Sequence, residues 1–458
     1  MDDRAKTIEA QLRSVFRTGA TLKVEHRETM LINLKKEILK LEPEIFAALH
    51  QDLGKCEFEA RATETGFTVS DINHTLDQLE EWTSITQSLA PIASQPASTR
   101  VIPSPKGTVL IIAPWNYPFQ LSIAPLVSAI AAGNTVAVKP SELTPNVSKI
   151  IKKLIDHAFP AGEVQCVLGG VDVSTELLRQ PFNHFFFTGG AKVGKIVAHA
   201  AAEQLAGVTL ELGGKSPCIV DKSAEITQTA RRIAWGKALN AGQTCVAPDY
   251  VIVHADIHDA LVDALKTEWK SFYGDDPETS PDYGRIVNEQ HFDRLDAILK
   301  ATKGNIHGGR RHRDRRFIEP TLLTGVDTKD ASMSEEIFGP ILPIFKWNKY
   351  ADIDFILEQH PDPLALYVFT ETSSFADRFL TQHSFGGGCV NHIAHHLGSP
   401  NLPFGGVRTS GVGQYHGKYG FDTFTHYKGI LDASTKFDVK LKYPPYGQRA
   451  GLLRWLYR

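Results

Sequence analysis

The sequence has few of the features that mark secreted or nucleic-acid-binding proteins. It contains only 5 cysteines among 458 residues, at positions 56, 166, 218, 245 and 389. An odd number of scattered cysteines argues against a disulfide scaffold and favours a reducing compartment. Because 49 Lys and Arg face 52 Asp and Glu, the net charge is only -3. Nucleic acid is therefore not an expected partner.

Long apolar runs are lacking as well. The most apolar stretch, 121–132, contains Pro125 and is far shorter than the roughly 20 residues that cross a bilayer. It predicts a buried helix. The first residues, Met-Asp-Asp-Arg-Ala-Lys, lack the basic start and apolar stretch of a signal peptide. We therefore expect a cytoplasmic protein.

The patterns that are present indicate an α/β protein, and the length favours about three domains. From residue 108, short apolar runs alternate with helical patterns, which is typical of a parallel, doubly wound sheet. A second such series begins near Cys218. Strands are expected at 108–113, 135–139, 164–168, 185–187, 208–212 and 250–254, and helices at 119–132, 145–158, 193–206, 224–239 and 257–270.

The segment before residue 108 has a different pattern. Apolar residues at helical spacing, such as Leu31, Leu34 and Ile38, predict helix from about 22 to 87. Four prolines between 91 and 105 then interrupt the pattern. This stretch is expected to be an extended excursion from the main body.

Three residues together indicate covalent catalysis. Cys245 follows Ala-Gly-Gln-Thr, so small and polar neighbours leave its thiol accessible to a substrate. Glu211, at the end of an expected strand and before two glycines, offers a base. Asn116, in Pro-Trp-Asn-Tyr-Pro, offers an amide that can stabilise an oxyanion. Singly, a cysteine is more often buried and inert, and a carboxylate at a strand end is often only solvated.

Two segments suggest a nucleotide site. Residues 187–194, Phe-Thr-Gly-Gly-Ala-Lys-Val-Gly, join a strand to a helix, where glycines let backbone N–H groups approach a phosphate. The spacing is not that of the G-x-G-x-x-G fingerprint, and an ordinary turn explains it equally well. Lys139 and Glu142 follow another parallel strand, where ligands bind and where the pair can hold ribose hydroxyls.

Two further clusters of residues do not indicate a metal or a nucleic-acid site. Cys389, His392, His395 and His396 lack the paired spacing of a zinc site, so we expect no metal. The basic run 307–316 is short, lacks aromatic residues and has acidic residues at 275–282 to balance it. It predicts a solvated loop instead of a nucleic-acid patch.

With these residues in view, the chain resembles the NAD(P)-dependent aldehyde dehydrogenases, specifically their class 3 branch, from about residue 23 to 430. The resemblance rests on long motifs in a fixed order. These are Pro-Trp-Asn-Tyr-Pro at 114–118, Glu-Leu-Gly-Gly-Lys-Ser-Pro-Cys at 211–218, Arg-Arg-Ile-Ala-Trp-Gly-Lys at 231–237, Gly-Gln-Thr-Cys-Val-Ala-Pro-Asp-Tyr at 242–250, Glu-Glu-Ile-Phe-Gly-Pro at 335–340, Leu-Pro-Phe-Gly-Gly at 402–406 and Tyr-His-Gly-Lys at 415–418.

The resemblance implies a role for each matching residue. Cys245 is expected to be the nucleophile that carries a thiohemiacetal and then a thioester, with Asn116 as oxyanion partner and Glu211 as base for the hydrolytic water. The other expected roles are Lys139 and Glu142 at the adenosine ribose, Gly189 and Gly194 at the turn near the pyrophosphate, Glu336 at the nicotinamide ribose, Phe338 beside the nicotinamide, Tyr117 and Trp235 as walls of the aldehyde pocket, and His396 near its mouth.

The resemblance also implies a three-part fold. A Rossmann-type cofactor domain (1–87 and 108–210), an α/β catalytic domain (211–414) and a small oligomerisation extension (88–107 and 425–436) are expected, followed by a tail (437–458). Class 3 relatives tend to be dimers, so a homodimer is expected. Packing of the basic and apolar end of the tail, 451–458, against the protein is favoured over contact with an anionic membrane.

The sequence therefore predicts oxidation of an apolar aliphatic or aromatic aldehyde to its acid, with NAD preferred and NADP tolerated. Two departures stand out: Gly190 replaces a residue that is commonly serine in the family, and Arg408 and Thr409 replace part of a glycine-rich stretch. The rival hypotheses are a cysteine hydrolase or acyltransferase, which needs a histidine base, and a non-catalytic scaffold.

Overall fold

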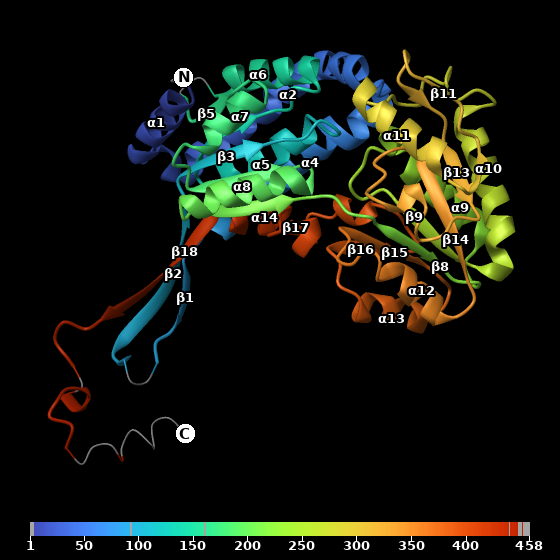
Figure 1. Cartoon of the computed structure of the whole chain (residues 1–458). Coiled ribbons are helices and arrows are strands. Elements are labelled where there is room, and N and C mark those ends of the chain that lie inside the picture. Colours follow the sequence, from blue (N-terminus) through green and yellow to red (C-terminus); the bar gives the residue numbers. More distant parts are fainter. Residues whose placement is uncertain (1–3, 92–93, 160–161, 439, 448–450, 452–458) are drawn as a thin grey trace.

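The computed structural model describes residues 4–91, 94–159, 162–438, 440–447 and 451. It forms two lobes, each built around a mostly parallel sheet, and a narrow arm that projects from the first lobe (Figure 1). This is the α/β architecture that the alternating pattern predicted. The prediction that 451–458 packs against the protein concerns residues that, apart from 451, lie outside the described part of the chain.

The first lobe contains a six-stranded sheet in the order β17-β7-β6-β3-β4-β5. All neighbours are parallel except β17, which is antiparallel to β7. The central strands are buried along their whole length, which explains their continuous apolar runs. The bounds are β3 Thr108–Ile112, β4 Thr135–Lys139, β5 Val164–Cys166, β6 His184–Thr188, β7 Gly207–Glu211 and β17 Gly411–Val412.

Helices cover this sheet. Every residue of α5 (Gln120–Ala131) is buried, including Pro125, so the apolar run at 121–132 is a buried helix, as predicted. Helices α6 and α8 lie close to their expected ranges, whereas α7 was not anticipated. The further bounds are α6 Pro145–Ala158, α7 Val171–Leu178, α8 Ala191–Glu203 and α14 Gly417–Thr423.

The second lobe contains a seven-stranded sheet in the order β10-β13-β14-β9-β8-β15-β16. Only β10 runs antiparallel to its neighbour. Its strands are β8 Pro217–Val220, β9 Tyr250–His254, β10 Asn305–His307, β13 Thr321–Thr324, β14 Ile341–Trp347, β15 Ala365–Phe369 and β16 Gly387–Val390. The lobe also holds α9 Ile226–Ala238, α10 His258–Tyr273, α11 Glu289–Ala301, α12 Tyr350–Leu357, α13 Ser373–Gln382 and a small ribbon of β11 Arg311–His312 with β12 Phe317–Ile318.

The arm is a three-stranded antiparallel sheet in the order β1-β2-β18. It pairs β1 (Thr86–Leu89) and β18 (Thr425–Ala433) with the central β2 (Ala97–Pro105). The proline-rich excursion predicted from the sequence is therefore a strand, with Pro103 and Pro105 inside it.

The prediction of helix from 22 to 87 was wrong in detail. Helix α2 (Val24–Leu53) ends at Gly54, whose φ of 66° is left-handed, a conformation that glycine adopts without steric cost. Short α3 (Glu57–Ala60), a π-helical turn and α4 (Gly66–Thr83) follow, and β1 already begins at Thr86. An additional N-terminal helix, α1 (Arg4–Arg17), was not predicted.

Within the described ranges, the structure contains no helix that is both long and apolar enough to cross a membrane.

Candidate active site

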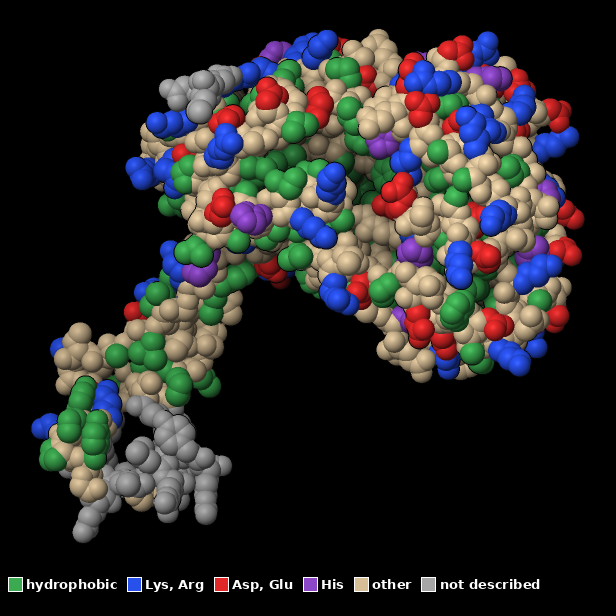
Figure 2. Space-filling model, viewed as in Figure 1, with side chains coloured by type: hydrophobic (Ala, Val, Ile, Leu, Met, Phe, Trp, Pro, Cys, Tyr) green, Lys and Arg blue, Asp and Glu red, His purple; other side chains and the backbone are tan. Residues whose placement is uncertain are grey.

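A cavity of about 410 Å³ lies where the carboxyl ends of strands in the first sheet face the second lobe. A hollow between the two lobes is visible in Figure 2. Asn116 enters it from the segment after β3, and Glu211 from the end of β7. Cys245 comes from the segment before β9. The three residues singled out for catalysis, far apart in sequence, thus line one cavity.

The backbone before Cys245 makes an unusual turn. After α9, Asn240 and Ala241 both have left-handed φ angles of 51° and 52°. At Gly242, with a φ of 75°, a Cβ would lie 2.3 Å from the carbonyl oxygen of Gly339. Only glycine fits there, so the Gly-Gln-Thr-Cys motif follows from a close approach between two backbone segments.

The side chain of Gln243 holds this turn in place. Its Nε2 donates to the carbonyl oxygens of Asn240 (3.0 Å) and Arg285 (2.9 Å), and its Oε1 accepts from the N–H of Val287 (2.9 Å). Because Gln243 is fully buried, these bonds are not in competition with water. The nucleophile candidate therefore follows a rigid turn.

The surroundings of Cys245 disfavour its ionised form. Burial, then the negative charges of Glu336 and Glu211, raise the pKa of the thiol to about 12. The backbone N–H groups of Cys245 and Val246 act in the opposite direction. The thiol is therefore protonated at neutral pH, and its proton has to leave as the reaction begins.

Glu211 is buried at the last position of β7. Neither side-chain oxygen has a hydrogen-bond partner among the described residues, and burial raises the pKa of the carboxyl group well above its usual range. Buried polar atoms are normally paired, so this orphaned carboxyl group marks a place for a water or a reacting group. A carboxyl group with a raised pKa is also a better general base than an exposed one.

Asn116 is held by bonds to its neighbours. Its Nδ2 donates to the carbonyl oxygen of Gln243 at 3.1 Å. An amide nitrogen carries two N–H donors, so this bond uses one and leaves the other for an oxyanion. The same bond ties Asn116 to the turn that carries Cys245.

The segment that carries Glu336 and Phe338 also lines the cavity. Burial raises the pKa of Glu336 to about 8, and a Cβ on Gly213 would lie 2.0 Å from its Oε2. Only glycine therefore lets this carboxyl group lie against the strand end. Phe338 has a left-handed φ of 47°.

Two residues that sequence reasoning missed hold this segment. Lys215 and Asp249 form a buried ion pair. Lys215 donates to the carbonyl oxygens of Ser332 (2.8 Å) and Glu335 (3.0 Å), and Asp249 accepts from the N–H of Ile337 (3.0 Å). Lys215 lies inside the motif at 211–218 and Asp249 inside the motif at 242–250. Their place in these motifs was the only feature of the sequence that pointed to them.

The turn between β6 and α8 fits a phosphate-bearing group. Gly189, Gly190 and Ala191 line the cavity at the N-terminus of α8, where backbone N–H groups favour an anion. A Cβ on Gly190 would meet nothing within 4 Å, and the buried Thr188 hydroxyl has no partner among the described residues. Gly194 is not among the residues that line the cavity. A Cβ on it would approach the Leu212 side chain to 2.6 Å, so the glycine lets α8 pack closely against the end of β7.

Lys139 and Glu142 do not line this cavity within the described chain. They form an ion pair of 2.6 Å at the end of β4, with the lysine buried and the glutamate partly exposed.

Tyr117 donates to or accepts from the Thr244 hydroxyl at 2.6 Å, next to Cys245. The Trp235 ring lies 5.8 Å from that of His395. His396, whose pKa burial lowers to about 4, lies 3.4 Å from the Cys389 sulfur.

The Cys389–His396 cluster and the basic run 307–316 are described by the structure as well. Among the residues that the structure describes, no group of three or more His, Cys, Asp or Glu is arranged to hold a metal ion. In the basic run, Arg310 pairs with Asp276 (2.8 Å) and Arg315 with Glu278 (3.2 Å). The acidic segment therefore balances the arginines, as the sequence suggested.

Comparisons with known proteins agree with this geometry. The model of the aldehyde dehydrogenase family matches residues 2–430. The chain is 47% identical over 435 residues to the 4,4'-diaponeurosporen-aldehyde dehydrogenase of Staphylococcus aureus, covering 95% of each chain. It is 43% identical to aldehyde dehydrogenase family 3 member A2 of Mus musculus, covering 95% of this chain and 90% of the relative.

Solved structures have the same fold. AldH of Staphylococcus aureus in a substrate-bound state superposes with a TM-score of 0.97 at 45% identity, covering 99% of each chain. An NAD-dependent aldehyde dehydrogenase from Sinorhizobium meliloti gives a TM-score of 0.87 at 26% identity, covering 96% of this chain and 89% of that one. The chain belongs to the aldehyde dehydrogenase family, similar to its class 3 members, and is an oxidoreductase that converts an aldehyde into the carboxylic acid.

Proposed function

We propose that Cys245, Asn116 and Glu211 carry out the two half-reactions of this oxidation. The observation that carries the proposal is their meeting in one cavity, with Asn116 tied to the cysteine turn and Glu211 left without a partner. The thiol of Cys245 releases its proton, to Glu211 or to a water molecule, and the sulfur attacks the aldehyde carbon. The remaining N–H of Asn116 and the backbone N–H of Cys245 stabilise the oxyanion that develops.

The second half-reaction releases the acid. Once the aldehyde carbon is oxidised, the acyl group remains on Cys245 as a thioester. Glu211 takes a proton from a water molecule, which attacks the thioester carbonyl and frees the sulfur. Burial raises the pKa of Glu211, so its ionised carboxylate is a stronger base than an exposed one.

The family uses NAD or NADP, and the residues present fit such a cofactor. The Gly189–Gly190 turn offers N–H groups for a pyrophosphate, and Glu336 offers a buried carboxyl group for a ribose. When bound, the nicotinamide supplies the acceptor for the hydride. Phe338 and Trp115, whose rings are 5.3 Å apart, give this part of the cavity an aromatic wall.

We predict that NAD+ is preferred and NADP+ tolerated. Lys139 attracts a 2'-phosphate, but Glu142 already neutralises it and repels the phosphate. Replacing Glu142 with glutamine should raise kcat/KM for NADP+ severalfold relative to NAD+, with a modest size because the glutamate is partly exposed. Glu176→Gln, which alters an exposed pair with Arg179 on α7, is the control. A strong NADP+ preference in the unmodified protein would show that Lys139 dominates instead.

We infer that the substrate is an apolar aldehyde. The cavity is lined by Leu121, Leu364, Phe404 and other apolar side chains, and a relative is named for 4,4'-diaponeurosporen-aldehyde. A series of linear aldehydes with NAD+ tests this. Each buried methylene contributes about 0.8 kcal/mol, so kcat/KM should rise up to about fourfold per carbon until the site is filled. A series without such a rise contradicts an apolar site, and absence of reduced nicotinamide with every aldehyde contradicts the activity.

We propose that the protein is a homodimer. The arm projects from the body with β1 exposed along its length (Figure 1), and hydrophobic side chains gather on it (Figure 2). Leu89 is 95% exposed and Leu431 47% exposed. An uncovered strand edge with apolar side chains favours pairing with another chain.

We also assign 1–87 with 108–210 to a cofactor domain, 211–414 to a catalytic domain and 88–107 with 425–436 to the oligomerisation extension. One element crosses that division, since β17, at 411–412, pairs with β7 in the first sheet. The scattered free cysteines support a cytoplasmic location.

A further inference from the structure

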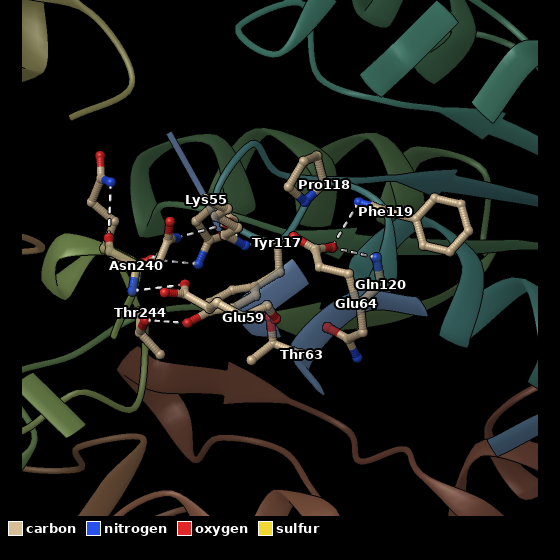
Figure 3. A network of polar contacts seen from close by, with 12 residues as sticks. Lys55, Glu59, Thr63, Glu64, Tyr117, Pro118, Phe119, Gln120, Asn240 and Thr244 are labelled. Atoms are coloured by element: carbon tan, nitrogen blue, oxygen red, sulfur yellow. Dashed lines mark hydrogen bonds and ion pairs between the residues drawn. The ribbon is translucent and has the colours of Figure 1, made fainter. Parts of the chain in front are cut away.

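A buried network of charged side chains from the segment between α2 and α4 contacts the carbonyl oxygen of Asn116. Figure 3 shows its members Lys55, Glu59 and Glu64. Lys55 follows α2, Glu59 lies in α3, and Glu64 lies in the π-helical turn Arg61–Thr65. The Lys55 and Glu64 side chains are both fully buried, and their Nζ and Oε1 atoms are 2.5 Å apart. Glu59 is 8% exposed. Charged groups are costly to bury unless they are paired and hydrogen-bonded, so their partners are informative.

Lys55 and Glu64 hold the segment that contains Asn116. The Lys55 ammonium donates to the carbonyl oxygen of Asn116 at 3.1 Å and lies 3.9 Å from the centre of the Tyr117 ring. Glu64 accepts from the N–H groups of Phe119 (3.1 Å) and Gln120 (2.8 Å), at the start of α5. The segment is therefore bound at both ends by a single ion pair.

Glu59 holds the turn that precedes Cys245. Its Oε1 accepts from the backbone N–H of Asn240 at 3.0 Å, one of the residues with a left-handed φ. Burial raises the pKa of Glu59 to about 7, with the charge of Lys55 acting in the opposite direction. Because an oxygen accepts a hydrogen bond in either protonation state, this contact does not require the charge.

Asn240 joins the two halves. Its Nδ2 donates to the carbonyl oxygen of Asn116 at 2.7 Å and to that of Gln243 at 3.1 Å. The same carbonyl oxygen of Gln243 also accepts the hydrogen bond from the side-chain amide of Asn116. The two donors assigned to the oxyanion, the Asn116 amide and the Cys245 N–H, are thus placed relative to each other by one network.

We propose that Lys55, Glu59 and Glu64 are positioning residues: Lys55 and Glu64 hold the Asn116 segment directly, and Glu59 acts through Asn240, so that the Asn116 amide and the Cys245 turn keep one geometry. The proposal rests on the functions proposed above for Asn116 and Cys245. It predicts an effect on the attack step alone. Loss of one oxyanion donor costs about 10²–10³ in rate, and a misplacement of about 1 Å can cost about 10²-fold.

The test compares variants at Glu59 with a matched buried carboxylate. Glu59→Ala removes the acceptor, Glu59→Gln keeps an oxygen there, and Asn240→Gly keeps the left-handed backbone while removing both side-chain donors. Asp52→Asn is the control, because Asp52 is also buried and accepts from Asn146 and Val147 at the start of α6, away from Asn116. The rate constant of the first NADH turnover with octanal, NAD+ affinity and melting temperature are measured for each.

Glu59→Ala and Asn240→Gly should lower the first-turnover rate constant by about 10-fold to 100-fold, with NAD+ affinity unchanged within twofold. Glu59→Gln should recover most of the rate. Asp52→Asn should lower the melting temperature and leave the rate constant near that of the unmodified protein. A purely structural role is indicated, and the proposal overturned, if the rate falls equally in Asp52→Asn or is unchanged in both Glu59→Ala and Asn240→Gly.

A second readout separates this proposal from the function on which it rests. If the unmodified protein oxidises no aldehyde, the proposed function fails, but alkylation of Cys245 by iodoacetamide still reports on the turn. Loosening the turn exposes the half-buried thiol further to water, so Cys245 should be alkylated severalfold faster in Glu59→Ala and Asn240→Gly than in Asp52→Asn or Glu59→Gln. Equal alkylation in all four variants would overturn the positioning role independently of activity.

Discussion

Replacing Cys245 with alanine is expected to abolish aldehyde oxidation while leaving cofactor affinity nearly unchanged. The sulfur forms the covalent bond to the substrate, whereas the groups that fit the cofactor, such as Glu336 and the Gly189–Gly190 turn, come from other segments. Loss of a catalytic nucleophile in other enzymes lowers kcat by up to about 10⁶-fold. The measurement pairs steady-state NADH formation with a fluorescence titration of NAD+.

Cys218→Ala is the matched control for this variant. Cys218 is fully buried in β8 and lies outside the cavity lining in the described chain. It should retain activity. If Cys245→Ala retained a substantial fraction of the turnover, the covalent mechanism would be excluded, and an intact NAD+ titration would show that the protein remained folded.

Replacing Glu211 with glutamine is expected to separate the two half-reactions. Glutamine keeps the shape of the side chain but cannot accept the proton of the hydrolytic water. We expect a burst of about one NADH per active site, followed by turnover slowed about 10²–10⁴-fold, the usual contribution of general base catalysis. Stopped-flow absorbance of NADH measures both phases.

The pH dependence of this burst tests whether Glu211 also activates the thiol. Burial and nearby carboxylates raise the pKa of Cys245 to about 12, so below that pH its thiolate fraction rises about tenfold per pH unit. If Glu211 deprotonates Cys245, the burst in Glu211→Gln is slow at neutral pH and accelerates as the pH rises. A fast burst that does not change with pH would limit Glu211 to the hydrolytic step.

The elements that sequence predicted well are those in which local pattern and tertiary burial agree. The strands at 135–139 and 250–254 are buried on both faces, so continuous apolar runs were sufficient to locate them. Helix α5 was predictable in spite of Pro125, because all of its residues enter the core. By contrast, α2 ends at a single left-handed glycine, which a periodic pattern cannot reveal.

The candidate site was predictable only where chemistry is carried by the residue type. A cysteine among small residues, a carboxylate before two glycines and an asparagine between prolines suggested a nucleophile, a base and an oxyanion donor. Their supports were not predictable, because Lys55 and Asn240 contact Asn116 across 61 and 124 residues of sequence, and Glu59 contacts Asn240 across 181. The Lys139–Glu142 ion pair likewise follows from side-chain directions that spacing alone does not determine.

The central claim is that the acyl group is held on Cys245 and released by Glu211. The most direct measurement is the mass of the Cys245 peptide from Glu211→Gln protein, quenched in acid within the burst after mixing with octanal and NAD+. The account predicts that this peptide gains the mass of one octanoyl group, and that the same peptide from the unmodified protein gains much less. An unmodified Cys245 peptide at every time in the burst, or an acyl group on another residue, would contradict it.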